Sequence, residues 1–223
     1  MILGNHDRGN DMSGEQLQAQ LKLLGYRNCS WKLCTWNYPE LSVVGARPCS
    51  PGGGYYLSPQ VQALFGPVPM EQSINRIVSS SEEASTSKPL ILLAHSGPTG
   101  LGSDSSSPCG RDWKLPAIDW GDQDLAIAID KIHQTRSIEL VVFGHMHHHL
   151  SRNQGYRKTF SKDNFGTFYL NAACVPRRGK DNSGAILSHF SWVEFLNGKV
   201  NHISHRWYKQ DLSIAYEEIL FSS

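Results

Sequence analysis

The sequence lacks the features that mark several large classes of protein. Its 21 Lys and Arg balance 20 Asp and Glu, and this net charge of +1 gives no electrostatic reason to expect binding to nucleic acid or to an anionic membrane. No apolar run approaches the roughly 18 residues that a membrane-spanning helix needs. The first residues also lack the basic and then apolar pattern of a secretory signal. We therefore expect a soluble, intracellular protein with no nucleic-acid or membrane partner.

Cysteine pairs of the C-x-x-C kind are absent as well. The five cysteines are odd in number and widely spread, which argues against a disulfide framework and favours free thiols in a reducing compartment. Charged residues make up 18% and hydrophobic residues 39%, as in ordinary folded proteins. A chain of 223 residues is within the size of one core, so we expect residues 1–223 to form a single domain.

Helical and extended patterns alternate along the chain. Apolar residues at helical spacing predict helices over 13–25, with Ser13 as the cap and Gly25 as the end, over 70–78, and from about 122 onwards. The Ser- and Gly-rich segments 79–88 and 100–113 are predicted to be mobile loops, the second of them either a lid or a surface insertion.

Three continuous apolar runs, "LSVVGA", "LILLAH" and "LVVFGH", are typical of strands buried on both faces. Later segments, "GTFYLNAA", "HFSWVEF" and "KVNHISHRWY", alternate more, as strands with one wetter face do. These patterns predict an α/β fold with a mixed sheet covered by helices.

Histidine follows an apolar segment at three separate places. "MILGNHD", "LILLAHSGP" and "LVVFGHMHHH" each end in this way, with a Gly close by. The carboxyl ends of strands in an open α/β sheet meet at one edge, so these histidines are expected to share a pocket. His145 and His147 both point into that pocket if the backbone between them is irregular, whereas His148 and His149 are predicted to be solvated.

The residue types in this pocket favour a divalent metal. Imidazole suits Zn²⁺, Fe and Mn²⁺, and mixed nitrogen and oxygen ligands are common in hydrolytic centres. Asn5 offers an amide oxygen as a ligand, and His95 and His145 offer ring nitrogens. His6 is better placed as an acid or a phosphate contact, with Asp7 fixing its tautomer.

Taken together, Gly4-Asn5-His6-Asp7, His95 in "AHSG" and Gly144-His145-Met146-His147 resemble, in order and spacing, the later motifs of the calcineurin-like metallophosphoesterases. More loosely, "VVGARP", "AHSGPTGLG" and "YLNAACVPR" resemble a branch of that superfamily from plants and cyanobacteria.

The resemblance implies a metallo-dependent phosphatase fold, which is a two-layer mixed β-sandwich flanked by helices. It also implies a dinuclear Mn, Fe or Zn centre that hydrolyses a phosphoester with metal-bound water. Asn5, His95 and His145 would bind one ion, His147 would bind the other, and His6 would be the catalytic histidine oriented by Asp7.

The same family begins with an Asp-x-His and a Gly-Asp motif, for which we find no counterpart before Gly4. Those positions supply the bridging aspartate and two further ligands, so that one ion is left with His147 alone. We therefore interpret the chain as a family member lacking its first strands and expect it to bind at most about one ion, because a single imidazole holds a metal poorly. A plastid transit peptide, if the protein has one, is expected in the missing segment.

Other chemistries fit the sequence less well. A metallo-β-lactamase would need H-x-H-x-D-H, but "HMHHHL" departs from it at two positions, and no G-x-S-x-G elbow surrounds Ser96. The stronger alternative is a non-catalytic remnant or binding module with weak or no metal binding. The expected partner is a phosphoester whose identity fold analogy does not select.

Three further positions carry weaker predictions. Arg47 and the pair Arg177-Arg178 follow predicted strands and are candidates for holding a substrate phosphate, since arginine is a good phosphate donor. His202 and His205 lie on opposite faces of an alternating segment, so we do not expect them to bind the same metal ion.

Overall fold

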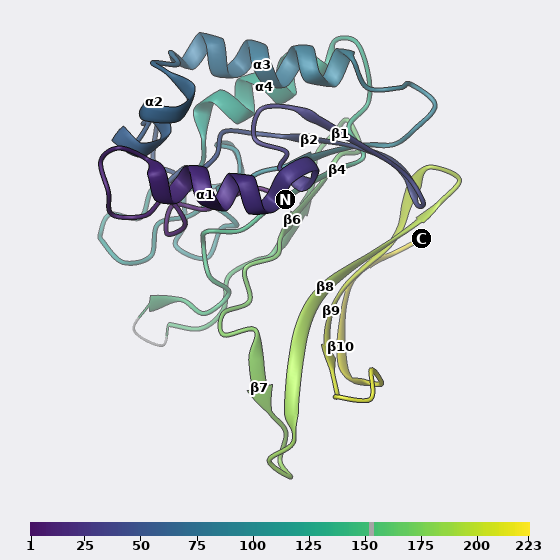
Figure 1. Cartoon of the computed structure of the whole chain (residues 1–223). Helices are drawn as coiled ribbons and strands as arrows, with labels where there is room; N and C mark the ends of the chain where they lie inside the picture. Colours follow the sequence, from purple (N-terminus) through teal and green to yellow (C-terminus); the bar gives the residue numbers. More distant parts are fainter. Residues whose placement is uncertain (152–153) are drawn as a thin grey trace.

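The computed structural model describes residues 1–151 and 154–223, which are built around two β-sheets (Figure 1). The first has six strands in the order β1-β2-β3-β4-β6-β5. Neighbours from β2 to β6 are parallel, and the edge strands β1 and β5 run antiparallel, so the predicted mixed sheet is confirmed. The strands in chain order are β1 (Leu33–Asn37), β2 (Glu40–Gly45), β3 (Leu90–Leu93), β4 (Leu140–Phe143), β5 (Phe160–Lys162) and β6 (Phe168–Asn171).

The second sheet is antiparallel, with the order β10-β9-β8-β7. Its strands are β7 (Arg178–Lys180), β8 (Ile186–Leu196), β9 (Lys199–Tyr208) and β10 (Ile214–Ser222). A cluster of buried side chains that includes Ile91 and Leu140 of the first sheet and Val200 and Ile203 of the second joins the two layers. This packing makes a two-layer sandwich.

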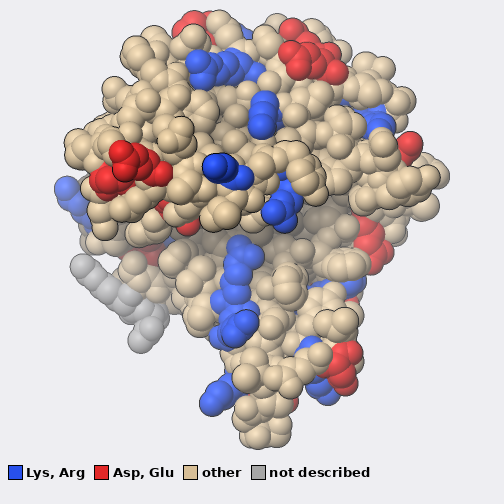
Figure 2. Space-filling model, in the orientation of Figure 1, with Lys and Arg blue, Asp and Glu red and all other residues tan. Residues whose placement is uncertain are grey.

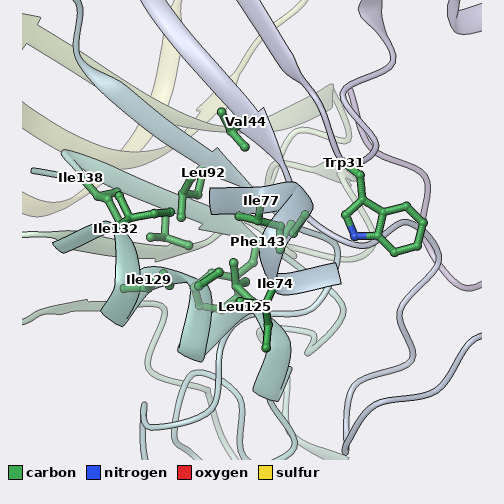
Figure 3. Packing of buried hydrophobic residues seen from close by; sticks show 14 of the residues in the cluster. Trp31, Val44, Ile74, Ile77, Leu92, Leu125, Ile129, Ile132, Ile138 and Phe143 are labelled. Carbon is green, nitrogen blue, oxygen red and sulfur yellow. The ribbon is translucent and has the colours of Figure 1, made fainter. Parts of the chain in front are cut away.

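Helices cover the other face of the six-stranded sheet. They are α1 (Glu15–Leu24), the 3₁₀ turn η1 (Gly25–Arg27), α2 (Pro59–Phe65), α3 (Met70–Glu82) and α4 (Gln123–His133). The labelled apolar side chains of α3 and α4 point towards Val44, Leu92 and Phe143 of the sheet (Figure 3). With helices on one face and β8–β10 on the other (Figure 1), the central strands are buried on both sides, which explains their continuous apolar runs.

The first predicted helix has a different start from the expected one. Helix α1 begins at Glu15 after Gly14, whose φ of 80° is left-handed, and the Ser13 hydroxyl donates to Asp11 instead of capping the helix. The predicted cap is therefore wrong, whereas the end of the helix at Gly25 is confirmed.

The loop predicted from residue 79 is wrong over its first part, because α3 continues to Glu82. Ser80 and Ser81 are buried, and the Ser81 hydroxyl donates to the carbonyl of Ile77 one turn earlier. The Ser81 hydroxyl therefore has a hydrogen-bond acceptor inside the helix, so a Ser-rich composition does not by itself exclude a helix here.

The loop over 100–113 is fixed by a buried arginine. Arg157 Nη1 donates to the carbonyl oxygens of Ser105, Ser107 and Gly110, at 2.9, 2.7 and 2.7 Å. Three charge-assisted bonds to one nitrogen argue against the predicted mobile loop. The segment forms a wall of the site described below.

Two extended segments also differ from expectation. Residues 1–4 form no ladder strand; Met1 and Leu3 instead accept single backbone hydrogen bonds from Cys29 and Cys49. Strand β6, expected to have a wetter face, is buried at all four positions because it lies inside the first sheet.

The surface and the thiols agree with the composition. Figure 2 shows positive and negative side chains interspersed over the visible face, apart from a column of Lys and Arg in the lower half near β7. All five cysteines are free thiols. Within the described part of the chain, no helix combines the length and apolarity needed to cross a membrane.

Candidate metal centre

Three of the predicted ligands meet at the carboxyl ends of β3 and β4. His95 and His145 each stand two residues beyond the end of their strand, and Asn5 approaches from the N-terminal segment. His95 Nε2 lies 2.8 Å from Asn5 Oδ1 and 3.2 Å from His145 Nδ1. Residues up to 140 positions apart in sequence therefore present one oxygen and two nitrogens to the same point.

Local backbone geometry makes this convergence possible. His145 has a left-handed φ of 64°, and the Met146 amide donates to the carbonyl of Gly144, so the segment turns sharply after β4. Such a conformation costs a non-glycine residue about 1–2 kcal/mol and is typical of functional sites. Gly4 is required too, because a Cβ there would lie 2.5 Å from the His95 ring.

Burial sets the charge of the two central rings. Burial first, and then the neighbouring histidines, lower the pKa of His95 to about 3 and that of His145 to about 4. Both rings are therefore neutral at ordinary pH, which is the form that donates a lone pair to a metal.

The remaining predicted residues lie around this group. His147 lines the same cavity and is exposed to it, and partial desolvation lowers its pKa as well. His6 is exposed and lines the cavity. The carboxylate of Asp7 accepts a hydrogen bond of 2.7 Å from the Gly4 amide, which braces the turn; its predicted role in orienting His6 stays a prediction.

The cavity that contains these side chains has a volume of about 560 Å³. Trp113 and Trp120, packed edge to face at 5.4 Å, form one wall, and Arg177 lies at another. Asp112 is the one carboxylate among the described lining residues, and it is engaged by the Ser151 amide at 2.6 Å and by Arg157 at 3.3 Å.

An asparagine that sequence reasoning missed holds the histidine segment in place. Asn171, at the end of β6, is buried, and its amide nitrogen donates to the carbonyls of Met146 at 2.7 Å and Pro108 at 3.2 Å. It thus ties the turn after β4 to the loop over 100–113. A polar residue directly after a buried strand was the available signal, the same signal that marked His95 and His145.

The order and spacing of these residues also match a known family. The family profile described as "Calcineurin-like phosphoesterase" matches residues 1–149, which is more than half of the chain and includes Asn5, His95, His145 and His147. The chain belongs to the calcineurin-like phosphoesterases. Members of this family are metal-dependent phosphoester hydrolases, and the mixed α/β architecture is consistent with the metallo-dependent phosphatase fold. No curated protein matches the chain.

The donor set of the calcineurin-like phosphoesterase site fits a divalent ion. One amide oxygen and two neutral imidazoles already converge within hydrogen-bonding distance of one another, as ligands of a borderline metal must. The two ring nitrogens face each other at 3.2 Å. At least one of those rings has to donate a proton or receive a cation for that approach to be favourable.

Two predictions about neighbouring residues are wrong. Arg47 is fully buried and bonds Asp122 at 2.7 Å and Asp124 at 3.1 Å, so it braces the core and does not reach a substrate. His148, predicted to be solvated, is buried, whereas His149 is exposed as expected. Arg177 lines the cavity, while Arg178 lies on β7 outside it.

Proposed function

We propose that the chain is a metal-dependent phosphoester hydrolase whose active site is the cavity around Asn5, His95 and His145. The observation that carries this proposal is the convergence of these three ligand atoms at the carboxyl edge of a parallel sheet, in a chain of this family. That edge is where ligands bind in open α/β sheets.

Each residue has a distinct part in the proposed reaction. Asn5, His95 and His145 would hold the ion, which when bound would supply Lewis-acid polarisation of the phosphoryl group and a lower pKa for water. His6 lies exposed at the cavity and donates a proton to the leaving oxygen. Asp7 orients the His6 ring, and Arg177 binds the phosphoryl oxygens from the opposite wall.

A dinuclear centre is the further part of this proposal. His147 is the ligand for a second ion, which is Mn, Fe or Zn like the first. Since Asp112 is the one described carboxylate in the cavity and is held by Arg157, this second ion needs ligands beyond those that line the cavity. We therefore expect the described lining of this cavity to bind about one Mn²⁺ ion, weakly.

The test measures metal and turnover together. Mn²⁺ is titrated into the metal-free chain by calorimetry, and hydrolysis of an aryl phosphate is followed at each metal concentration. We expect one weakly bound ion and a slow, Mn²⁺-dependent reaction, both lost in His145→Ala and both kept in His202→Ala, a control on β9 far along the chain.

Two outcomes contradict the proposal in different ways. Metal binding with no hydrolysis above that of His145→Ala would favour the non-catalytic binding module. Two tightly held Mn²⁺ ions per chain would show that the ligand set assigned here is incomplete.

A further inference from the structure

A second cluster of metal-ligating side chains lies on the other side of the histidine segment. His148, Cys174 and His189 are all buried, and their ligand atoms lie within 4.8 Å of one another. In a tetrahedral zinc site the bond lengths place ligand atoms about 3.3–3.8 Å apart. Side-chain shifts of about an ångström therefore suffice to close the cluster around an ion.

His148 is already oriented as a ligand. Its Nε2 donates to the carbonyl oxygen of Asn171, at 3.1 Å. With the proton on Nε2, the lone pair is on Nδ1, which is the nitrogen left for an ion. A backbone carbonyl that fixes the tautomer in this way is the usual companion of a metal-bound histidine.

The other two side chains have their donor atoms free. Among the described residues, neither the Cys174 sulfur nor the ring nitrogens of His189 have a hydrogen-bond partner, although both residues are buried. The His189 ring packs edge to face with Trp207 at 5.1 Å, which holds it beside His148. Both side chains line the second cavity beside His148, so their donor atoms are available to an ion that enters it.

His205 is a neighbour of this cluster and not a member. Its ring lies 4.8 Å from that of His148, but Nδ1 bonds the Ser191 hydroxyl at 3.0 Å and Nε2 bonds the Thr159 hydroxyl at 2.9 Å. Both nitrogens are therefore occupied. The ring instead packs against the two ligand histidines and limits their movement.

The cluster opens into a cavity of its own. This cavity has a volume of about 500 Å³ and is bordered on its outer side by Tyr216 and Glu218 of β10. Cys174 and His189 line it and do not line the cavity of the first site. With three protein ligands, a tetrahedral ion keeps one position open towards this space.

We infer that His148, Cys174 and His189 form a second metal site, selective for Zn²⁺ or another thiophilic divalent ion. The thiolate and two imidazoles are softer donors than the amide and imidazoles of the first site, so the two sites prefer different ions. Binding moves the Cys174 proton to water and leaves a thiolate on the ion. The open position takes water or a small anion from the cavity.

Cobalt(II) distinguishes the two sites without reference to activity, because only a cobalt–thiolate bond gives an intense charge-transfer absorption in the near ultraviolet. The metal-free chain is titrated with Co²⁺ and the absorption recorded. We expect the band in the unmodified chain, its loss in Cys174→Ser, and its retention in Cys34→Ser, a control thiol on β1. His95→Ala, which disrupts only the first site, keeps the band.

Thermal unfolding shows whether each variant is folded and whether it binds Zn²⁺. Zn²⁺ binding to the native state is expected to raise the melting temperature of the unmodified chain and of Cys34→Ser by more than that of Cys174→Ser and of His189→Ala, which keep only the first site. The matched histidine control is His202→Ala, which keeps the zinc-dependent rise. A cobalt-loaded chain without the band, or a band that survives in Cys174→Ser, would overturn the inference.

Discussion

The two histidine clusters lie in separate cavities beside one short segment, and they differ in the third ligand that joins two imidazoles. The first uses Asn5, His95 and His145 at the carboxyl edge of the parallel strands. The second uses a thiol and two imidazoles beneath the β8–β9 sheet. The difference shows that adjacent histidines can serve separate cavities, since His147 lines the first cavity and His148 lines the second.

The backbone between them explains how one segment serves both. After the left-handed turn at His145, the backbone of His148 is hydrogen-bonded to the backbone of Ala173 and of Arg157. Asn171 contacts both clusters. Its side-chain amide donates a hydrogen bond to the Met146 carbonyl, and its backbone carbonyl accepts one from the His148 ring. The two clusters are therefore separate in ligands and joined through one residue of β6.

The largest effect on activity is expected from His145→Ala, which disrupts the first site and leaves the second intact. His145→Ala removes one of three ligands, so Mn²⁺ binding and aryl phosphatase activity are expected to fall to background together. The cobalt–thiolate band of the second site stays. Metal analysis and turnover on the same preparation check this result, and a joint loss of both metals would show that the clusters are one centre.

His6→Ala is expected to have the next largest effect. Removing a general acid lowers kcat by about 10²–10⁴-fold, while metal content at both clusters is unchanged. An aryl phosphate with a good leaving group suffers less than an alkyl ester, since it needs less protonation. If the variant instead loses Mn²⁺, His6 is a ligand and the acid lies elsewhere.

Gly4→Ala is expected to disturb the first cluster through packing. The added Cβ meets the His95 ring at 2.5 Å, so the ring shifts and Mn²⁺ affinity falls by about 10–100-fold, as when an outer contact of a ligand is altered. Gly144→Ala is the matched control, because its Cβ would meet Ala173 at an ordinary 3.6 Å. Equal affinities for the two variants would contradict the close approach of Gly4 to His95.

Arg177→Ala is expected to have the smallest effect. This exposed side chain lines only the first cavity, so its loss raises KM for an aryl phosphate by about 3–10-fold with little change in kcat. Arg178→Ala, on β7, leaves KM unchanged. Steady-state kinetics of the two variants measure the difference, and a fall in kcat for Arg177→Ala would give this residue a part in the chemical step.

The helices and strands were largely readable from the sequence. Runs such as "LILLAH" identified the strands because burial on both faces leaves no polar position. The first part of segment 79–88 was misread because buried serines can satisfy their hydroxyls inside a folded helix, as Ser81 does by donating to the carbonyl of Ile77. The cap of α1 was misplaced because Gly14, in a left-handed conformation, is the residue that precedes the helix. The Ser13 side chain makes no capping hydrogen bond.

The first cluster was predictable because parallel strands of one sheet end at a common edge. His95 and His145 had to approach each other once β3 and β4 paired, whatever the rest of the fold. The second cluster gave no such signal. Cys174 and His189 come from a loop and from a strand of the other sheet, and their meeting with His148 depends on how the two sheets pack.

The sequence by itself predicted three of the helices, the central strands, the types of ligand and the meeting of Asn5, His95 and His145, because hydrophobic period and the residues that follow a strand are local properties of the chain. Tertiary structure decided that Arg47 is a buried ion-pair partner and not a phosphate ligand. It also decided that His148 turns inward towards Cys174 and His189. The direction of a side chain on irregular backbone, and its partner in another sheet, are settled only by long-range packing.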